Sequence, residues 1–349
     1  MKITRHHEDL QLAQSACALG MFDGVHVGHR MVLENAIREA RILSETHHST
    51  IPSVVFSFSD HPQQLLAKTP TALLSSLDER LAMFEQLGFD HALILDFDPW
   101  LRNLSPKAFV DKVLLNTLGA KHVSVGYDYR FGKDKTGTGD TLSTLGAEKG
   151  FGVTVIEPVK RIENAQIASS TLIRKLLTYG DITAANQLLG RPYQLSGTVV
   201  EGYQRGRKLG FPTANLNISQ QRIVPAIGTY SGIASLKSPT SGIEKKYTAL
   251  CNIGICPTFN NQDQPDKEPQ SDESKPLCRL EVYLLDYSGP EFYGETLSFN
   301  FYERLRDEMA FPSLEALIAQ IHSDVAHVRQ NAVLDGKMTH IAQEAGYSI

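Results

Sequence analysis

The chain of 349 residues has few cysteines, no basic excess and no long apolar run. Its four cysteines form no C-x-x-C pair, so we interpret them as buried free thiols in a reducing compartment rather than as zinc ligands. They are Cys17, Cys251, Cys256 and Cys278. Lysine and arginine number 34 against 39 aspartates and glutamates, a net charge of −5 that argues against a general nucleic-acid-binding protein.

The sequence also lacks targeting and membrane signals. The N-terminus, MKITRHHEDL, is charged and has no apolar core of a signal peptide, and no segment approaches the length of a membrane span. We therefore expect a cytoplasmic protein without a membrane partner. The composition leaves self-association open.

The first half alternates short apolar strands with helical patterns. Strands are expected at 16–22, 52–58, 91–97, 121–127 and 152–157, and helices at 29–44, 76–87, 105–118 and 141–148. Ser76 and Glu79 form a capping box, and Ser105 precedes Pro106 at a second helix start. This alternation predicts an α/β domain over 1–188 with a Rossmann-like parallel sheet, in which ligands bind at the carboxyl ends of the strands.

The second half has a different periodicity. Segments rich in β-branched and aromatic residues follow one another without a long helix, at 193–201, 228–236, 246–254, 278–286 and 295–303. They predict a compact antiparallel barrel or sandwich over 189–334, closed by a helix at 314–328. That helix places apolar residues on one face: Leu314, Leu317, Ile318, Ile321, Val325 and Val328. Residues 261–276 are polar and predict a mobile surface loop, and the tail 335–349 has no pattern.

The segment GMFDGVHVGHR, residues 20–30, carries the strongest chemical signal. His26 and His29 stand between an apolar strand and a helix, where free backbone N–H groups and the helix dipole favour anions. Gly24 and Gly28 allow the backbone to approach a phosphate closely. This H-x-G-H arrangement is typical of nucleotidylyltransferases; the alternative is a glycine turn with two solvated histidines.

Three later segments are expected at the same ligand-binding crevice, at the carboxyl ends of the parallel strands. FSFSDHP (56–62) and VGYDYRFG (125–132) each follow a strand, and Asp128 can hydrogen-bond a ribose or a base. SSTLIR (169–174) opens a helix whose Ser170 and Thr171 can bind phosphate, with Arg174 one turn on. An ordinary N-cap is the alternative for this last segment.

The second half carries GRKLGFPTANL, residues 206–216. Gly210 and Pro212 shape a turn that presents Thr213 and Asn215. A hydroxyl and an amide carbonyl are hard oxygen ligands suited to Mg²⁺ bridging nucleotide phosphates. A plain turn is the alternative.

Over residues 14–330 these motifs resemble the bifunctional prokaryotic riboflavin kinase/FMN adenylyltransferase (FAD synthetase) family. The family motifs G-x-F-D-G-V-H-x-G-H, F-x-P-H-P, V-G-x-D-F-x-F-G and S-S-T-x-I-R match the first half. The resemblance implies that His26 and His29 bind the triphosphate and stabilise the transition state. It implies a wider ATP site of Phe22, Asp23, Gly24, Gly28, Asp128, Ser170, Thr171 and Arg174. Asp60 replaces a proline of the family, and Leu172 replaces an arginine.

The barrel motifs extend the resemblance. The family's riboflavin kinase half is a six-stranded barrel with G-x-P-T-A-N-L, which implies that Gly210, Pro212, Thr213 and Asn215 bind ATP and that Thr213 and Asn215 hold Mg²⁺. LEVYLLDY (280–287) implies Glu281 as the catalytic carboxylate, and FYGETLSFNFYERLRDEMAF (292–311) implies Arg306 and Glu308 at the flavin. In NIGICPTF (252–259), Cys256 replaces an arginine of the family.

The resemblance implies conversion of riboflavin to FMN and of FMN to FAD, with one ATP for each step and release of pyrophosphate in the second. Two alternatives stay open. The first is another nucleotidylyltransferase fused to an unrelated β domain; a class I aminoacyl-tRNA synthetase is disfavoured because Lys337-Met338-Thr339 lacks the second lysine of its loop. The second is a flavin sensor that has lost catalysis, which the changes at residues 60, 172 and 256 favour.

Overall fold

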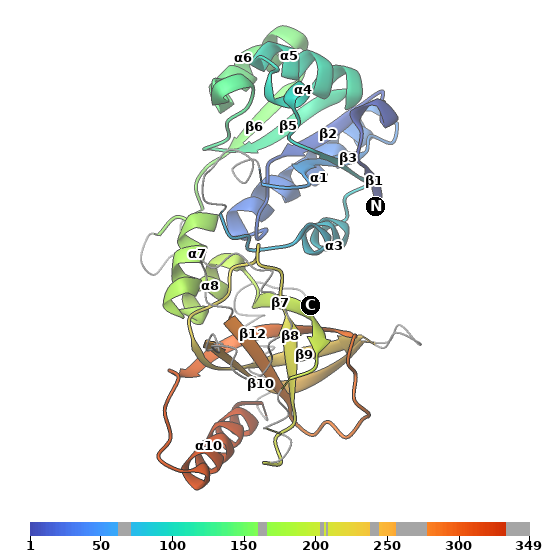
Figure 1. Ribbon diagram of the computed structural model, residues 1–349. Helices are drawn as coiled ribbons and strands as arrows, with labels where there is room; N and C mark the ends of the chain where they lie inside the picture. Colours follow the sequence, from blue (N-terminus) through green and yellow to red (C-terminus); the bar gives the residue numbers. More distant parts are fainter. Residues whose placement is uncertain are drawn as a thin grey trace, which may run out of the picture. The chain divides into compact units, whose positions relative to one another are not determined.

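The computed structural model describes residues 1–61, 71–159, 166–202, 206, 209–237, 244–255 and 278–332 (Figure 1). The expected loop at 261–276, the substituted Cys256 and the tail 335–349 lie outside these ranges. Contacts divide the chain into two compact units, Met1–Leu172 and Ile173–Ile349. This division falls earlier in the sequence than the boundary expected at residue 188.

The first unit is built on a six-stranded parallel sheet in the order β1-β4-β3-β2-β5-β6. Its strands are β1 (Lys2–Thr4), β2 (Ser15–Leu19), β3 (Ser53–Phe58), β4 (His91–Leu95), β5 (Ala120–Gly126) and β6 (Gly152–Ile156). The predicted parallel sheet and its five strands are confirmed. Edge strand β1 was not predicted, because its three residues have no apolar pattern.

Helices and short helical turns connect these strands: η1 (His7–Asp9), α1 (Val27–His47), α3 (Leu77–Leu87), α4 (Pro99–Arg102), α5 (Pro106–Phe109), η2 (Val110–Thr117), η3 (Lys133–Lys135) and α6 (Gly139–Lys149). The predicted capping box is present, since Ser76 Oγ accepts from Glu79 N at 3.1 Å and Ser76 N donates to Glu79 Oε2 at 3.0 Å. The helix predicted at 105–118 is not one regular α-helix. After α5 it widens into the π-helical η2, which turns Val110, Val113 and Leu114 into the core.

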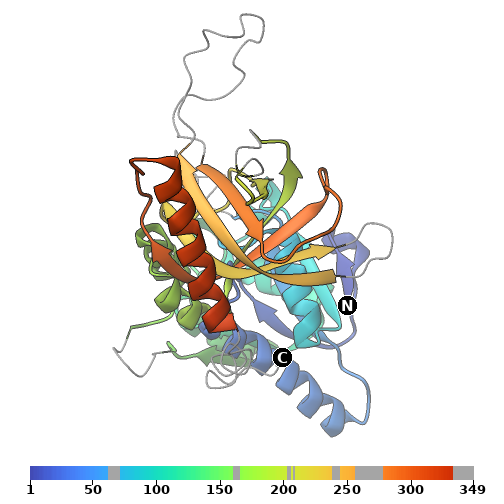
Figure 2. The ribbon, with the colours of Figure 1, turned by 90° about the horizontal axis from the view of Figure 1, so that it is seen from below.

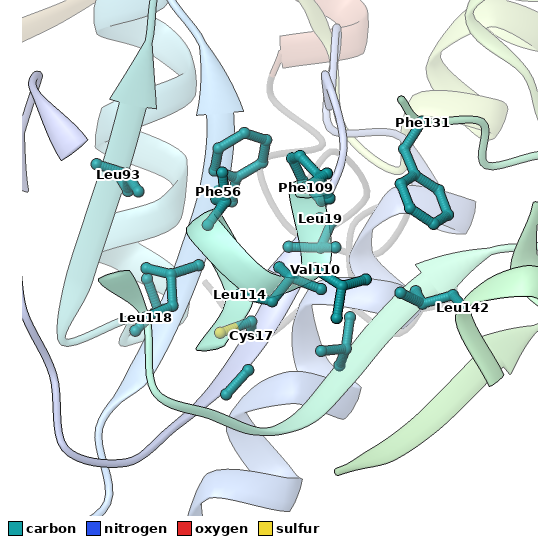
Figure 3. Packing of buried hydrophobic residues seen from close by; sticks show 14 of the residues in the cluster. Cys17, Leu19, Phe56, Leu93, Phe109, Val110, Leu114, Leu118, Phe131 and Leu142 are labelled. Carbon is teal, nitrogen blue, oxygen red and sulfur yellow. The ribbon is translucent and has the colours of Figure 1, made fainter. Parts of the chain in front are cut away.

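The sheet is covered by apolar side chains on both faces, as a doubly wound fold requires. On β2, Cys17 and Leu19 belong to one buried cluster and Ala18 to the other. Figure 3 shows the first cluster, where Phe56 and Phe109 lie over the sheet. Cys17 and Cys251 are buried and free, as predicted. Burial raises the pKa of the Cys17 thiol to about 12, so this thiol is unreactive.

The second unit is a closed antiparallel barrel in the order β10-β11-β8-β7-β12-β9. Its strands are β7 (Tyr193–Val200), β8 (Thr213–Asn217), β9 (Gly228–Lys237), β10 (Glu244–Ile255), β11 (Cys278–Leu284) and β12 (Thr296–Arg306). The predicted six-stranded barrel is confirmed. Thr213 and Asn215, expected on a turn, lie on the short strand β8, because pairing with β11 and β7 extends the segment after Pro212.

In the described part of the chain, helices α7 (Ser170–Tyr179), α8 (Ile182–Leu189) and α10 (Leu314–Ala332) accompany the barrel. Helix α8 is fixed by Asn186, whose amide donates to Phe301 O and accepts from Tyr193 N. Helix α10 lies along the barrel, as Figure 2 shows. Val325 and Val328 pack against it, whereas Leu314, predicted on the same apolar face, is 51% exposed because the packing is concentrated towards the end of the helix.

Candidate active sites

The turn after β2 is strained and leads directly into α1. Phe22 and Val25 have positive φ angles of 52° and 40°, and Gly24 between them has a φ of 83°. Such left-handed backbone is costly for residues with a branched or bulky side chain, and it recurs at functional sites. The buried Phe22 ring packs edge-on against Phe84 at 5.9 Å and so holds the turn in place.

Asp23 holds this turn from within. Its buried carboxylate accepts hydrogen bonds from Leu74 N and from Ser75 N, both at 3.0 Å, while Gly24 N donates to Ser75 Oγ at 2.8 Å. Ser170 Oγ donates to the Asp23 carbonyl oxygen at 2.9 Å and ties the start of α7 to the same turn. The structure therefore gives Asp23 a role in shaping the site.

His26 and His29 meet at the start of α1. His26 is the N-cap, and its Nδ1 accepts from His29 N at 3.3 Å, so a neutral His26 carries its proton on Nε2. The two rings stack with centroids 3.6 Å apart and planes inclined by 20°. Two imidazoles beside the free N–H groups of a helix start make an anion-binding arrangement. The structure does not show the alternative of two independently solvated histidines, because the two rings are stacked on each other.

Gly28 lies directly beneath the His26 ring. A Cβ at this position would be 3.2 Å from His26 Cε1, so Gly28→Ala must displace the imidazole by a few tenths of an ångström. Alanine favours helices, so we expect folding to be kept. We expect the FMN adenylylation that the family resemblance implies to fall on the order of tenfold, since small misplacements of reacting groups are costly. Steady-state kinetics beside Ile42→Ala, an exposed change on the same helix, tests this; equal rates in both would show that the ring tolerates the shift.

The neighbouring segments reach the same edge of the sheet. Strands β2 and β5 are adjacent and parallel, so the turns after them share the point where the strand order reverses, the usual ligand site of such sheets. Asp128 is exposed in the turn after β5. At the start of α7, Ser169 Oγ accepts from Leu172 N at 3.3 Å, which is the ordinary N-cap. Thr171 is exposed there, and Arg174 lies one turn further along α7, in the second unit.

A row of polar side chains crosses the barrel. Asn215, Glu281, Asn252 and Thr229 are Cα partners on successive strands β8, β11, β10 and β9, so they share one face. The flanking Leu280 and Val282 are buried on the opposite face. The prediction that Glu281 faces away from these two residues and towards Thr213 and Asn215 is confirmed.

Asn215 and Thr213 have side-chain oxygen atoms of the kind that coordinate a divalent cation. Asn215 Oδ1 is buried and accepts no hydrogen bond from the described residues. A Cβ at Gly202 would be 2.1 Å from Asn215 Nδ2, and one at Gly206 would be 3.4 Å from Thr213 Oγ1, so both glycines lie close against these two side chains. An unpaired buried carbonyl beside a hydroxyl fits a hard cation. Within the described ranges no three His, Cys, Asp or Glu side chains converge as a metal cluster.

Glu281 has an ionic neighbour that the sequence analysis missed. Arg279 Nη1 lies 3.2 Å from Glu281 Oε1, and strand alternation, which puts residues two apart on one face, would have revealed the pair. Arg279 pairs with Gly254, and a Cβ at Gly254 would be 3.1 Å from Glu308 Oε1. Glu308 therefore adjoins the polar row.

Arg306, predicted to contact the flavin, forms an ion pair with Asp324 on α10. Its Nε and Nη2 donate to Asp324 Oδ2 at 3.0 and 2.9 Å, and Gln320 Nε2 donates to Asp324 Oδ1 at 2.8 Å. The Arg306 guanidinium also lies 5.7 Å from the centre of the Phe311 ring. This nearly buried ion pair fastens α10 to the end of β12.

We expect Asp324→Ala to destabilise the barrel. Removing the carboxylate leaves the partly buried Arg306 without its main acceptor, a loss on the order of 2 kcal/mol for a charged hydrogen-bonded pair. Thermal unfolding should show a clear drop in the melting temperature. Asp307→Ala is the matched control, since Asp307 is 81% exposed where it pairs with Arg304, and it should change the melting temperature little. Equal effects of the two variants would contradict this role of the Arg306–Asp324 pair.

Comparison with known proteins agrees with these two sites. The family model described as FAD synthetase matches residues 9–171, and the one described as riboflavin kinase matches residues 189–332. The bifunctional riboflavin kinase/FMN adenylyltransferase of Bacillus subtilis (strain 168) is 35% identical over 89% of this chain and 90% of its own length. That of Escherichia coli (strain K12) is 33% identical over 95% and 97%.

A crystal structure described as a macrolide-efflux protein from Streptococcus pneumoniae has the same fold. The TM-score is 0.77 at 27% identity, and the likeness covers 94% of this chain and 98% of that one. In the part of the present chain that the structure describes, no helix is long and apolar enough to cross a membrane.

The fold and the two sites define a two-domain enzyme, with a nucleotidylyltransferase unit followed by a riboflavin-kinase barrel. Kinases and nucleotidyltransferases of these families use ATP, in general with a divalent metal. The chain belongs to the bifunctional riboflavin kinase/FMN adenylyltransferase family.

Proposed function

We propose that the barrel phosphorylates riboflavin to FMN and that the parallel-sheet unit adenylylates FMN to FAD with release of pyrophosphate. The observation that carries the proposal is the placement of Glu281 beside Asn215, whose carbonyl oxygen is buried and unpaired among the described residues. We assign residues 1–188 to the adenylyltransferase and 189–334 to the kinase. The buried free thiols Cys17 and Cys251 support a reducing compartment such as the cytoplasm.

In the kinase reaction, Thr213 and Asn215 would hold Mg²⁺, and this cation would neutralise charge on the ATP phosphates. Gly210, with a φ of 86°, and Pro212 form the turn that leads into β8 beside the nucleotide. Glu281 accepts the proton of the ribityl 5′-hydroxyl as that oxygen attacks the γ-phosphorus. Because phosphoryl transfer has a loose transition state, orientation and charge neutralisation contribute most of the rate.

The flavin lies on the same face of the barrel in this proposal. Arg279 orients Glu281 through their ion pair, and Glu308 contacts the flavin. Arg306 also lies at the flavin in this proposal, with its guanidinium oriented by the ion pair to Asp324 on α10.

In the adenylylation reaction, the FMN phosphate attacks the α-phosphorus of a second ATP and no covalent enzyme intermediate forms. His26 and His29 donate hydrogen bonds to phosphate oxygens as negative charge develops there. Phe22, Gly24 and Gly28 shape the surface that receives the triphosphate, and Asp23 holds that turn. Asp128 binds the ribose, while Ser170, Thr171 and Arg174 bind phosphate at the start of α7.

Incubation of purified protein with riboflavin, ATP and Mg²⁺, followed by chromatography, tests the proposal. FMN should appear first and FAD should follow at its expense, and both should stop without ATP. Tight flavin binding without either product would indicate a sensor that has lost catalysis. FMN without FAD, or transfer of a nucleotide to another acceptor from a panel, would overturn the assignment of the first unit.

A further inference from the structure

Arg80, on α3, is a buried arginine outside both proposed sites. It has no exposed surface, although arginine is rarely buried completely. Its Nη1 donates to Met21 O at 3.0 Å and to Ser57 Oγ at 2.9 Å. Its Nη2 donates to the carbonyl oxygens of Phe58 at 2.9 Å and Ser59 at 3.1 Å.

These acceptors all lie where β2 and β3 leave the sheet. Met21 is the residue directly before Phe22, at which the strained turn to the histidines begins. Ser57 Oγ also donates to Met21 O at 3.1 Å, so the end of β3 and the guanidinium both bind the same carbonyl. Arg80 thus joins the ends of two neighbouring strands at the edge where ligands of parallel sheets bind.

Fold stability alone explains this residue poorly. All four acceptors are neutral, and among the described residues no carboxylate lies within 4.0 Å of the guanidinium. Burial lowers the pKa of Arg80, and the more distant carboxylates of Asp23 and Asp60 oppose that shift. A cation at the end of the first turn of α3 also opposes the helix dipole. A buried charge without an ion-pair partner in contact is costly, and this one stands beside a proposed site for a polyanion.

We propose that Arg80 is a positioning residue for adenylyl transfer. Its hydrogen bonds to Met21 and to the end of β3 fix the turn that carries His26 and His29. Its buried charge adds to the positive potential that the triphosphate and the leaving pyrophosphate meet. This proposal rests on the proposed adenylyltransferase function. In it, Arg80 does not contact the substrate.

The variants R80K and R80M separate the contribution of the hydrogen bonds from that of the buried charge. R80M loses both, and we expect kcat for FMN adenylylation to fall on the order of 10- to 100-fold, with a higher KM for ATP. R80K keeps the charge but cannot make four hydrogen bonds in this geometry, so its KM for ATP should stay near that of the wild type while its kcat falls. Arg102→Met, the same change at an exposed position of the first unit, should alter neither constant.

Riboflavin phosphorylation by the same polypeptides is the internal control, and it should stay within twofold of the wild type. Folded R80M with wild-type kcat and KM would overturn the proposal, even with a lower melting temperature. If R80M yields no folded protein, the proposal is tested on R80K alone. A wild-type kcat for FMN adenylylation in R80K would then overturn the proposal. If the wild type forms no FAD, the proposed function itself fails; if it forms FAD and the variants match it, only the role of Arg80 fails.

Discussion

His29→Ala is expected to lower the rate of FAD formation from FMN by about 10²- to 10³-fold, the usual cost of removing one donor to a developing oxyanion. The change removes one of two imidazoles stacked 3.6 Å apart at the start of α1, and with it a donor to the phosphate oxygens. FMN formation from riboflavin should stay near normal, because the barrel lies in the other compact unit. Separate assays with riboflavin and with FMN as the supplied substrate measure the two rates.

His47→Ala provides the matched control, since His47 is an exposed histidine near the end of the same helix. It should leave both activities unchanged. Equal loss of both activities in a folded His29→Ala protein would contradict the assignment of the two reactions to two sites. Full adenylylation by the variant would reduce the histidine pair to a helix cap.

Local signals explain why so much of the fold could be predicted. A strand buried on both faces is a short apolar run, and a capping box such as Ser76 with Glu79 depends on residues three apart. The histidine turn is of this kind too, because glycines and helix periodicity surround it within a dozen residues. Such features are specified by neighbours in the sequence.

Contacts between distant segments could not be predicted. The carboxylate of Asp23 accepts hydrogen bonds from Leu74 N and Ser75 N, some fifty residues away, and no local pattern encodes these contacts. The ion pair of Arg306 is likewise absent from any local pattern, because its partner Asp324 lies on a helix that packs against the barrel only after folding. Charge and motif predict where polar residues gather, whereas tertiary packing decides which of them remain available to a substrate.

The polar row of the barrel combines both kinds of information. Alternation along β11 was enough to put Glu281 on the face opposite Leu280 and Val282. The register that sets it beside Asn215 and Asn252 depends on pairing with β8 and β10, which no local pattern encodes. The carboxylate is therefore the residue on which the kinase assignment can be tested most directly.

Glu281→Gln is expected to lower kcat for FMN formation by about 10²- to 10⁴-fold, the range for loss of a general base. Glutamine keeps the shape and one acceptor oxygen but cannot take the proton of the attacking hydroxyl. The KM for ATP should change little, because Thr213 and Asn215 are untouched. Adenylylation of supplied FMN should persist, since it uses the other unit. Rates of both half-reactions across neutral pH provide the measurement.

Loss of the ion pair must be separated from loss of the base, because Arg279 Nη1 lies 3.2 Å from Glu281 Oε1. Arg279→Gln removes the same ion pair and leaves the carboxylate in place. Both side chains are about one third exposed, so the pair itself contributes little to stability. If Glu281 is the base, Arg279→Gln should lower kcat far less than Glu281→Gln does. Equal losses in the two variants would assign the effect to the ion pair, and near-normal phosphorylation by Glu281→Gln would leave this residue as an ordinary strand carboxylate.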